Sequence, residues 1–228
     1  MKLGGLLFLL LLSLTGQAQN RAFYAGLFPE AAVTGSVNQN WQLTFKVESQ
    51  HGSFDNRQRE GQRWDYFHNQ TDLQGFVARK LNPFWKVSGG YQYRLEGGGG
   101  TNTHRTIQQV ALVQRLRRVR LGHRVRTDQT YYPGDATEWR GRYRLSAEIP
   151  LVGEELDPGE LYWLLSNELI YSHQGGDNEV ENRLVSSLGR YFSPKVKLEA
   201  GLDYRTDRYV AEGFRQRLWL KVGAYINI

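Results

Sequence analysis

The 228-residue chain contains no cysteine. It therefore has no disulfide framework, no thiolate metal site and no cysteine to carry a lipoprotein acyl anchor. Long apolar runs are also missing. Beyond Leu6–Leu12, no stretch approaches the roughly 18 apolar residues of a transmembrane helix. These absences exclude a helical membrane protein.

Residues 1–18 have the features of a secretory signal peptide. Lys2 supplies a positive end, Leu6–Leu12 an apolar core, and Gly16 and Ala18 the small residues of a cleavage site. A membrane-anchoring helix is the alternative, but the apolar run is too short to span a bilayer. We expect residues 1–18 to be removed on export and residues 19–228 to form one domain.

The segment Glu138–Ile149 alternates strictly between polar side chains and apolar or small ones. Its odd positions include Trp139 and Tyr143, and five of its six even positions are charged. Successive side chains of a strand point to opposite faces. Twelve residues at about 3.3 Å each are also long enough to cross a bilayer as a tilted strand. We therefore predict a barrel strand with its apolar face towards lipid and its charged face towards a lumen.

Similar segments recur along the chain and predict an all-β fold, a single antiparallel transmembrane β-barrel of about 10–12 strands with a polar, arginine-rich lumen. Long loops alternate with shorter turns, as expected for external loops and periplasmic turns, and ten strands satisfy an even-number rule. Residues 21–34 are left over, either to complete twelve strands or to lie inside the lumen. The ten predicted strands are Trp41–Gln50, Trp64–Leu81, Trp85–Leu95, Thr106–Leu116, Val119–Asp128, Glu138–Ile149, Leu161–Tyr171, Arg183–Phe192, Val196–Arg205 and Arg217–Ile228.

A soluble secreted β-barrel that binds a ligand would alternate in the same way, so other features must decide. The polar faces carry ions at a density that a packed soluble core could not bury cheaply. Aromatic residues also gather near both ends of the strands, as in the two girdles of an outer-membrane barrel. They are Trp41, Phe84, Trp85, Trp163 and Phe192 beside short turns, and Tyr131, Tyr132, Trp139, Tyr171 and Tyr209 beside long loops.

The last residues resemble the C-terminal signal by which barrel-insertion machinery recognises outer-membrane proteins. The pattern is a polar residue, a glycine two positions later, and apolar residues at the third-from-last and last positions. Lys221, Gly223, Ile226 and Ile228 fill these positions, although the customary terminal aromatic is absent. We therefore expect that machinery and outer-membrane lipid to be partners.

Two polar residues contradict the pattern. His123 and Asn167 fall on the face assigned to lipid. A β-bulge near each one would shift the local phase and turn both side chains inward.

The main candidate site is the set of charged residues on the lumen faces. Two interpretations are open: a plug of salt bridges that fills a narrow barrel, or a cation-lined passage for small anions, because arginines outnumber acids. The set comprises Arg120, Arg124, Arg126, Asp128, Arg140, Arg142, Arg144, Glu148, Glu168, Arg183, Glu199, Asp203, Arg205 and Arg217.

An enzyme of the outer membrane, a hydrolase or acyltransferase with a site at the rim, is the second class considered. His104 and His173 stand beside predicted long loops, with Ser172, Asp128 and Asp177 as possible neighbours. No G-x-S-x-G motif is present, and no pair of histidines has metal-site spacing. We therefore expect no enzymatic activity, no metal and no cofactor.

The net charge of +6 could suggest a nucleic-acid partner. The arginines recur at every second position within strands instead of forming a basic patch, and an exported chain rarely meets nucleic acid. We expect no nucleic-acid partner. The small-molecule ligand, if the lumen has one, is not identified by the sequence.

The chain from Val119 to Ser187 resembles an uncharacterised family of bacterial outer-membrane proteins, catalogued as domain of unknown function 2490 and common in Bacteroidetes and Proteobacteria. This resemblance implies a barrel in a Gram-negative outer membrane and no known activity, so it assigns no catalytic residue. The residues that carry it are Arg124-Val125-Arg126, Arg140, Arg142, Tyr143, Arg144, Leu145, Ile149-Pro150-Leu151, Asn167-Glu168 and Asn182-Arg183-Leu184.

Overall fold

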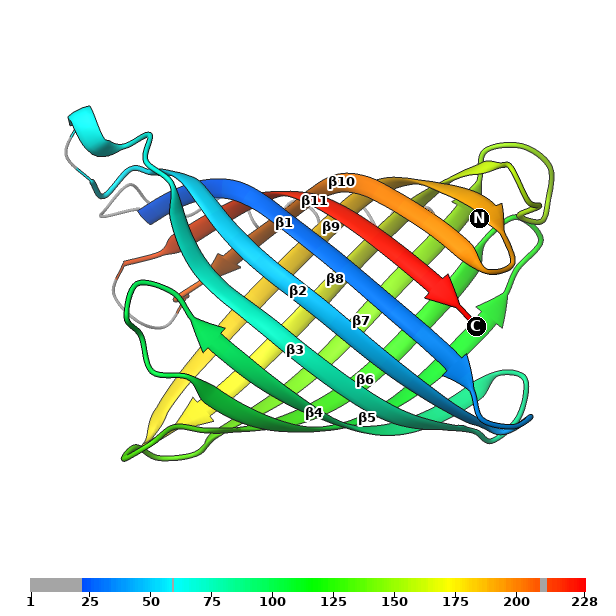
Figure 1. Ribbon diagram of the computed structural model, residues 1–228, viewed down its shortest axis with the longest axis horizontal. Helices are drawn as coiled ribbons and strands as arrows, with labels where there is room; N and C mark the ends of the chain where they lie inside the picture. The colour runs from blue at the N-terminus through cyan, green and yellow to red at the C-terminus, as the bar shows by residue number, and fades with distance from the viewer. Residues whose placement is uncertain (1–21, 59, 210–212) are drawn as a thin grey trace.

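The computed structural model describes residues 22–58, 60–209 and 213–228, in which eleven strands form one closed barrel (Figure 1). This confirms the predicted all-β barrel. The predicted signal peptide, residues 1–18, lies outside the described residues. The strands are β1 (Ala22–Ser36), β2 (Trp41–Asp55), β3 (Phe67–Lys80), β4 (Trp85–Glu96), β5 (Thr103–Arg115), β6 (Arg120–Tyr131), β7 (Glu138–Pro150), β8 (Leu161–Gln174), β9 (Asp177–Ser193), β10 (Val196–Asp207) and β11 (Arg215–Asn227).

The segment left over by the sequence pattern closes the barrel. It forms β1, which pairs antiparallel with β2 and parallel with β11, from Ala22 opposite Arg215 to Thr34 opposite Asn227. The described part of this segment, residues 22–34, therefore neither brings the count to twelve nor lies inside the lumen. An even number of strands is required only if every neighbouring pair is antiparallel, and a single parallel pair permits the observed eleven.

The connections define two ends of the barrel. At the turn end, on the right of Figure 1, four-residue turns join β1 to β2, β3 to β4 and β5 to β6; at the loop end, residues 56–66 join β2 to β3. The predicted alternation of long and short connections holds with two exceptions. Residues 151–160 form a ten-residue connection at the turn end, and β8 and β9 are joined at the loop end by Gly175 and Gly176 alone.

The long loop expected after Tyr171 is absent, because β8 continues to Gln174 and β9 begins at Asp177. Gly175 and Gly176 have φ angles of 58° and 101°. Two consecutive residues with positive φ form the tight hairpin turn whose twist matches that of the strands, and glycine adopts that conformation without strain. The glycine pair thus extends the ladder where the sequence predicted a loop.

Alternation along β7 gives the faces that the sequence predicts. Trp139 and Tyr143 are exposed on the outer surface, whereas Glu138 and Arg142 are buried inside. Trp41, Phe84, Trp85, Trp163 and Phe192 are also exposed near the turn end, and Tyr131, Trp139, Tyr171 and Tyr209 near the loop end. Among the described residues, no helix is both long enough and apolar enough to cross a membrane.

His123 and Asn167 stay on the outer face, and the predicted bulges are absent. The pairings of β6 with β5 and β7, and of β8 with β7 and β9, run without a register shift. Neighbouring outward side chains satisfy the two residues instead. Nδ1 of His123 lies 2.9 Å from the Tyr143 hydroxyl, and Asn167 donates to Asn182 at 3.1 Å. Hydrogen bonds between neighbouring outward side chains therefore satisfy these polar groups, and no β-bulge turns them inward.

The interior has little apolar packing. Its buried apolar cluster comprises Tyr24 and Phe28 of β1 and Trp219 of β11, with Phe67 packed against them. These rings occupy the loop half of the barrel, beside the parallel seam. The remaining interior is polar, as expected for a barrel whose wall directs every second side chain inward.

Close approach of β9 and β10 yields a test of the fold. A Cβ atom on Gly201 would lie 2.2 Å from the Ser186 carbonyl oxygen and 2.4 Å from Ser187 Cα, whereas one on the outward-facing Gly75 would meet nothing within 4 Å. We expect Gly201→Val to lower the free energy of unfolding in detergent micelles by about 1–3 kcal/mol, because backbone cannot yield as a side chain can. Gly75→Val is the control and should change it little. Equal stability of the two variants would contradict this register.

Candidate functional site

The interior contains a polar cavity of about 300 Å³. Its lining includes eleven lysines and arginines and five aspartates and glutamates, and two carboxylates outside the lining, Asp128 and Glu181, also pair with lining arginines. The cations are Lys46, Lys86, Arg94, Arg105, Arg124, Arg126, Arg142, Arg144, Arg183, Arg205 and Lys221, and the anions are Glu30, Glu48, Asp72, Glu168 and Asp203.

One wall of the cavity, on β6–β9, is basic. Arg142 is at its centre, with Nη1 3.2 Å from Asp128 and Nη2 2.6 Å from Glu168. Glu168 also accepts a bond of 2.6 Å from Arg124, and Arg126 contacts Asp128. Two carboxylates therefore serve three arginines, so this wall remains positive.

The opposite wall, on β1–β3, contains most of the acids. Glu30 accepts from Lys46 at 3.0 Å, from Lys221 at 3.2 Å and from the Tyr225 hydroxyl at 2.6 Å. Lys46 also contacts Glu48 at 2.6 Å. The Glu30 carboxylate is thus held by three donors from two other strands, β2 and β11.

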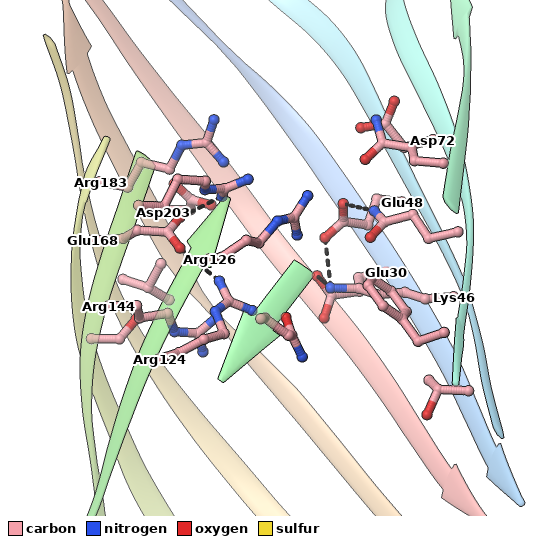
Figure 2. A pocket seen from close by; sticks show the side chains of 18 of the residues that line it. Glu30, Lys46, Glu48, Asp72, Arg124, Arg126, Arg144, Glu168, Arg183 and Asp203 are labelled. Atoms are coloured by element: carbon pink, nitrogen blue, oxygen red, sulfur yellow. Dashed lines mark hydrogen bonds and ion pairs between the residues drawn. The ribbon is translucent and has the colours of Figure 1, made fainter. Parts of the chain in front are cut away.

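The two walls face each other across the cavity. Figure 2 shows Arg124, Arg126 and Arg144 on one side and Glu30 and Glu48 on the other. Charge separated in this way produces a field across the lumen, and low-dielectric walls strengthen it. A solute in the cavity would be oriented with its negative group towards β6–β9.

Three cations of the cavity have no carboxylate partner. Among the side chains that the structure describes, no ion pair joins Lys86, Arg105 or Arg144 to a carboxylate. Arg105 is buried, and its single hydrogen bond there is from Nε to the Thr130 hydroxyl at 2.8 Å, which leaves one Nη without an acceptor. Donors of this kind lower the cost of holding an anion in the cavity.

The loop half of the interior is filled. Arg217 contacts Glu181 at 2.9 Å and also Asp207, which accepts from Arg215 at 2.7 Å. At the loop rim, the Tyr132 hydroxyl donates to Glu138 at 3.0 Å. Burial, and then the Glu138 charge, raise the pKa of Tyr132, so the phenol remains protonated.

The turn half leaves more room, because small side chains line the cavity there, among them Thr34, Thr44, Ala78 and Ser88. The lining also includes Arg94 and Arg105, near the loop ends of β4 and β5. Of the three unpaired cations, Lys86 is near the turn end and Arg105 is near the loop end.

Eight of the fourteen residues predicted for the lumen line this cavity, namely Arg124, Arg126, Arg142, Arg144, Glu168, Arg183, Asp203 and Arg205. The other six contribute to charged contacts elsewhere. Arg120 and Glu148 lie 3.6 Å apart, Arg140 pairs with Glu138 at 2.6 Å, and Glu199 accepts from Tyr162 at 2.7 Å. Asp128 pairs with Arg142 on the basic wall, and Arg217 pairs with Glu181 in the loop half.

The acidic wall was missed by the sequence analysis. Glu30 lies in the segment that could not be assigned, and Asp72 in a strand whose phase was not determined. Lys46 and Glu48 lie in the predicted strand Trp41–Gln50, and their alternation with Phe45 and Val47 was the signal that could have found them.

The residues of the predicted insertion signal lie on both faces of β11. Lys221 faces the cavity, and Gly223 lies beneath the Tyr225 ring, where a Cβ atom would be 2.8 Å from the Tyr225 hydroxyl oxygen. Ile226 and Ile228 are exposed. Recognition of these residues by insertion machinery stays a prediction.

The candidate catalytic residues do not come together. His104 contacts Tyr91, and His173 lies 3.0 Å from the Asn178 side chain, both on the outer face. Asp128 is fully buried inside, in contact with arginines. Within the part of the chain that the structure describes, no group of three or more potential metal ligands gathers either.

Arg142 offers a test of the charged network. We expect Arg142→Ala to lower the free energy of unfolding by about 3–5 kcal/mol, because it leaves two buried carboxylates with one cation fewer. The control is Arg120→Ala, which removes a half-exposed partner 3.6 Å from Glu148 and should cost at most about 1 kcal/mol. Denaturant unfolding of the refolded barrel measures both. A similar small loss in both variants would show that the network contributes little.

Comparison with protein families gives a match over most of the chain. The family model described as protein of unknown function (DUF2490) matches residues 25–213, which include most of β1, all of β2–β10 and all the charged residues of the basic wall. No curated protein and no solved structure matches the chain. The match confirms the resemblance read from the alternating arginines, and it covers most of the barrel. The chain belongs to the DUF2490 family of proteins of unknown function.

Proposed function

We propose that this protein is exported, is inserted in the outer membrane of a Gram-negative cell, and passes small anions through its lumen. The loop end would face outward and the turn end the periplasm. The membrane placement is supported by the closed wall without free edges, by exposed aromatic residues near both ends, and by outward apolar side chains between them.

The anion assignment depends on one observation: three cations on the cavity, Lys86, Arg105 and Arg144, form no ion pair with a carboxylate among the side chains that the structure describes. Cations enclosed without partners repel one another, and an entering anion relieves that repulsion. Arg144 and Lys86 lie on the cavity with no ion-pair partner among the described side chains, so they are available to such an anion. Because the loop half is filled, we expect a low conductance.

The membrane placement predicts heat-dependent mobility. A folded barrel resists detergent, so the unboiled protein from the outer-membrane fraction should migrate differently on a gel from the boiled protein. Identical migration, or recovery of the folded protein in a soluble periplasmic fraction, would contradict the placement.

The anion assignment predicts selectivity in planar bilayers. With a KCl gradient across the membrane, the reversal potential should have the sign of a chloride-selective path, and Arg144→Gln should move it towards zero. Arg117→Gln is the matched control, because it removes the same charge from an exposed turn outside the lumen. A membrane that stays closed over a broad voltage range would leave the interior as a structural plug.

A further inference from the structure

A second cluster of reactive side chains lies on the outer face at the loop end of β2 and β3. Ser49 Oγ is 2.8 Å from Nε2 of His51, whose Nδ1 is 2.9 Å from the Tyr66 hydroxyl. Ser49 Oγ is also 2.7 Å from the Thr71 hydroxyl, which lies 2.8 Å from Nε2 of His68. The cluster contributes nothing to the lumen and lies apart from the histidines that the sequence analysis considered.

Strand geometry accounts for the cluster. Ser49 and His51 are two residues apart on β2, so they share a face. Ser49 pairs with Thr71 on β3, and a register shift then places His51 opposite His68. The shift adds one residue on the β3 side, and it brings a second imidazole to the same face.

The hydrogen bonds can run in one direction through the cluster. If Nδ1 of His51 carries its proton and donates to the Tyr66 oxygen, Nε2 is free to accept the proton of Ser49. A serine whose hydroxyl is bonded to an imidazole, itself oriented by a third group, is the arrangement of an activated nucleophile. The three groups are within the distances that this arrangement requires.

The cluster lies at a definite height on the barrel. Trp41 is exposed near the turn end, and Ser49 follows it eight residues later on the same strand, about 26 Å along the chain. A strand tilt of about 40° reduces this to about 20 Å along the barrel axis, close to the roughly 25 Å height of an apolar barrel belt. Trp64 and Tyr66 are exposed beside it. With Trp41 at one boundary of the membrane proposed above, the hydroxyl lies near the other boundary between hydrocarbon and headgroups, where lipid esters lie.

We propose that Ser49 and His51 form the nucleophile and the general base of an acyl-ester hydrolase whose substrate is a glycerophospholipid. The substrate class rests on the membrane placement proposed above. Tyr66 is a positioning residue that holds the imidazole in the required tautomer. Thr71 is the donor next to the attacking oxygen and is placed to stabilise negative charge on the ester carbonyl.

The chemistry balances with water as the only co-reactant. Ser49 Oγ bonds to the ester carbonyl carbon as its proton passes to Nε2 of His51, and the bond to the glycerol oxygen breaks as that oxygen takes the proton. Water then attacks the acyl-serine and gives a proton to His51. The fatty acid leaves when this proton returns to Ser49.

The test uses the full barrel refolded in detergent micelles. The measurements are labelling by a fluorophosphonate probe and fatty-acid release from mixed micelles that contain phosphatidylethanolamine. We expect Ser49→Ala to abolish labelling and His51→Ala to slow both reactions about a hundredfold or more. Thr71→Val should lower kcat by about a hundredfold and leave KM nearly unchanged. Ser53→Ala is the matched control, an exposed serine of the same strand whose hydroxyl bonds only to a backbone carbonyl, and it should keep full activity.

Heat-dependent gel mobility shows that each variant is folded before it is assayed. Folded wild-type barrel that is labelled no faster than Ser49→Ala overturns the proposal. Labelling at Ser49 with release from a soluble p-nitrophenyl ester but not from phospholipid overturns the lipid assignment. Loss of anion selectivity in bilayers would contradict the lumen proposal alone, because that site shares no residue with this cluster.

Discussion

Closure of the sheet is the constraint on which the rest of the structure depends. A closed wall satisfies the backbone of every strand and directs alternate side chains into a confined space. Ions in that space are far from bulk water, so each must find a partner or a counter-ion. The parallel pairing of β1 with β11 completes the wall, and it also delivers Glu30 and Lys221 to the interior from the two ends of the described chain.

Pairing inside the barrel is uneven. Arg142 forms ion pairs with Asp128 and Glu168, which connects three neighbouring strands. Glu30 forms ion pairs with Lys46 and Lys221, which connects β1 to β2 and β11. Such pairs repay much of their desolvation cost only because the geometry is close. The cations outside the network have no such compensation. A buried positive surplus of this kind is expensive for stability, which is the physical argument for a function that uses it.

The sequence predicts the wall well, because alternation is a local property. Trp139 and Arg142 of β7 lie on the faces expected from their positions, and all ten predicted strands are present. Which side chains contact each other across the lumen depends on strand register and on barrel closure. A local sequence pattern predicts neither of these. The contact of Tyr225 with Glu30 joins residues of the last and first strands, and β1 itself gives a weak signal because small residues interrupt its alternation.

The sequence did not predict the cluster on β2 and β3 for a related reason. Ser49 and His51 are visible as a pair two residues apart, but the position of His68 depends on the register shift within the β2–β3 ladder. Sequence reasoning instead selected His104 and His173 because they are near predicted loops. The register shift places His68 on the face that Ser49, His51 and Thr71 already share.

The seam between the first and last strands also has a consequence for assembly. Ala22 pairs with Arg215, so the edge of β1 has no neighbour on that side until nearly the whole chain is available. During this interval a fifteen-residue strand presents unpaired backbone groups, a template for pairing with other chains. Contacts so distant in sequence also form slowly. In a nascent barrel of this topology, the first strand must therefore be protected until the last strand is available. The longer β1 and β11 take to pair, the longer the chain can aggregate through this edge.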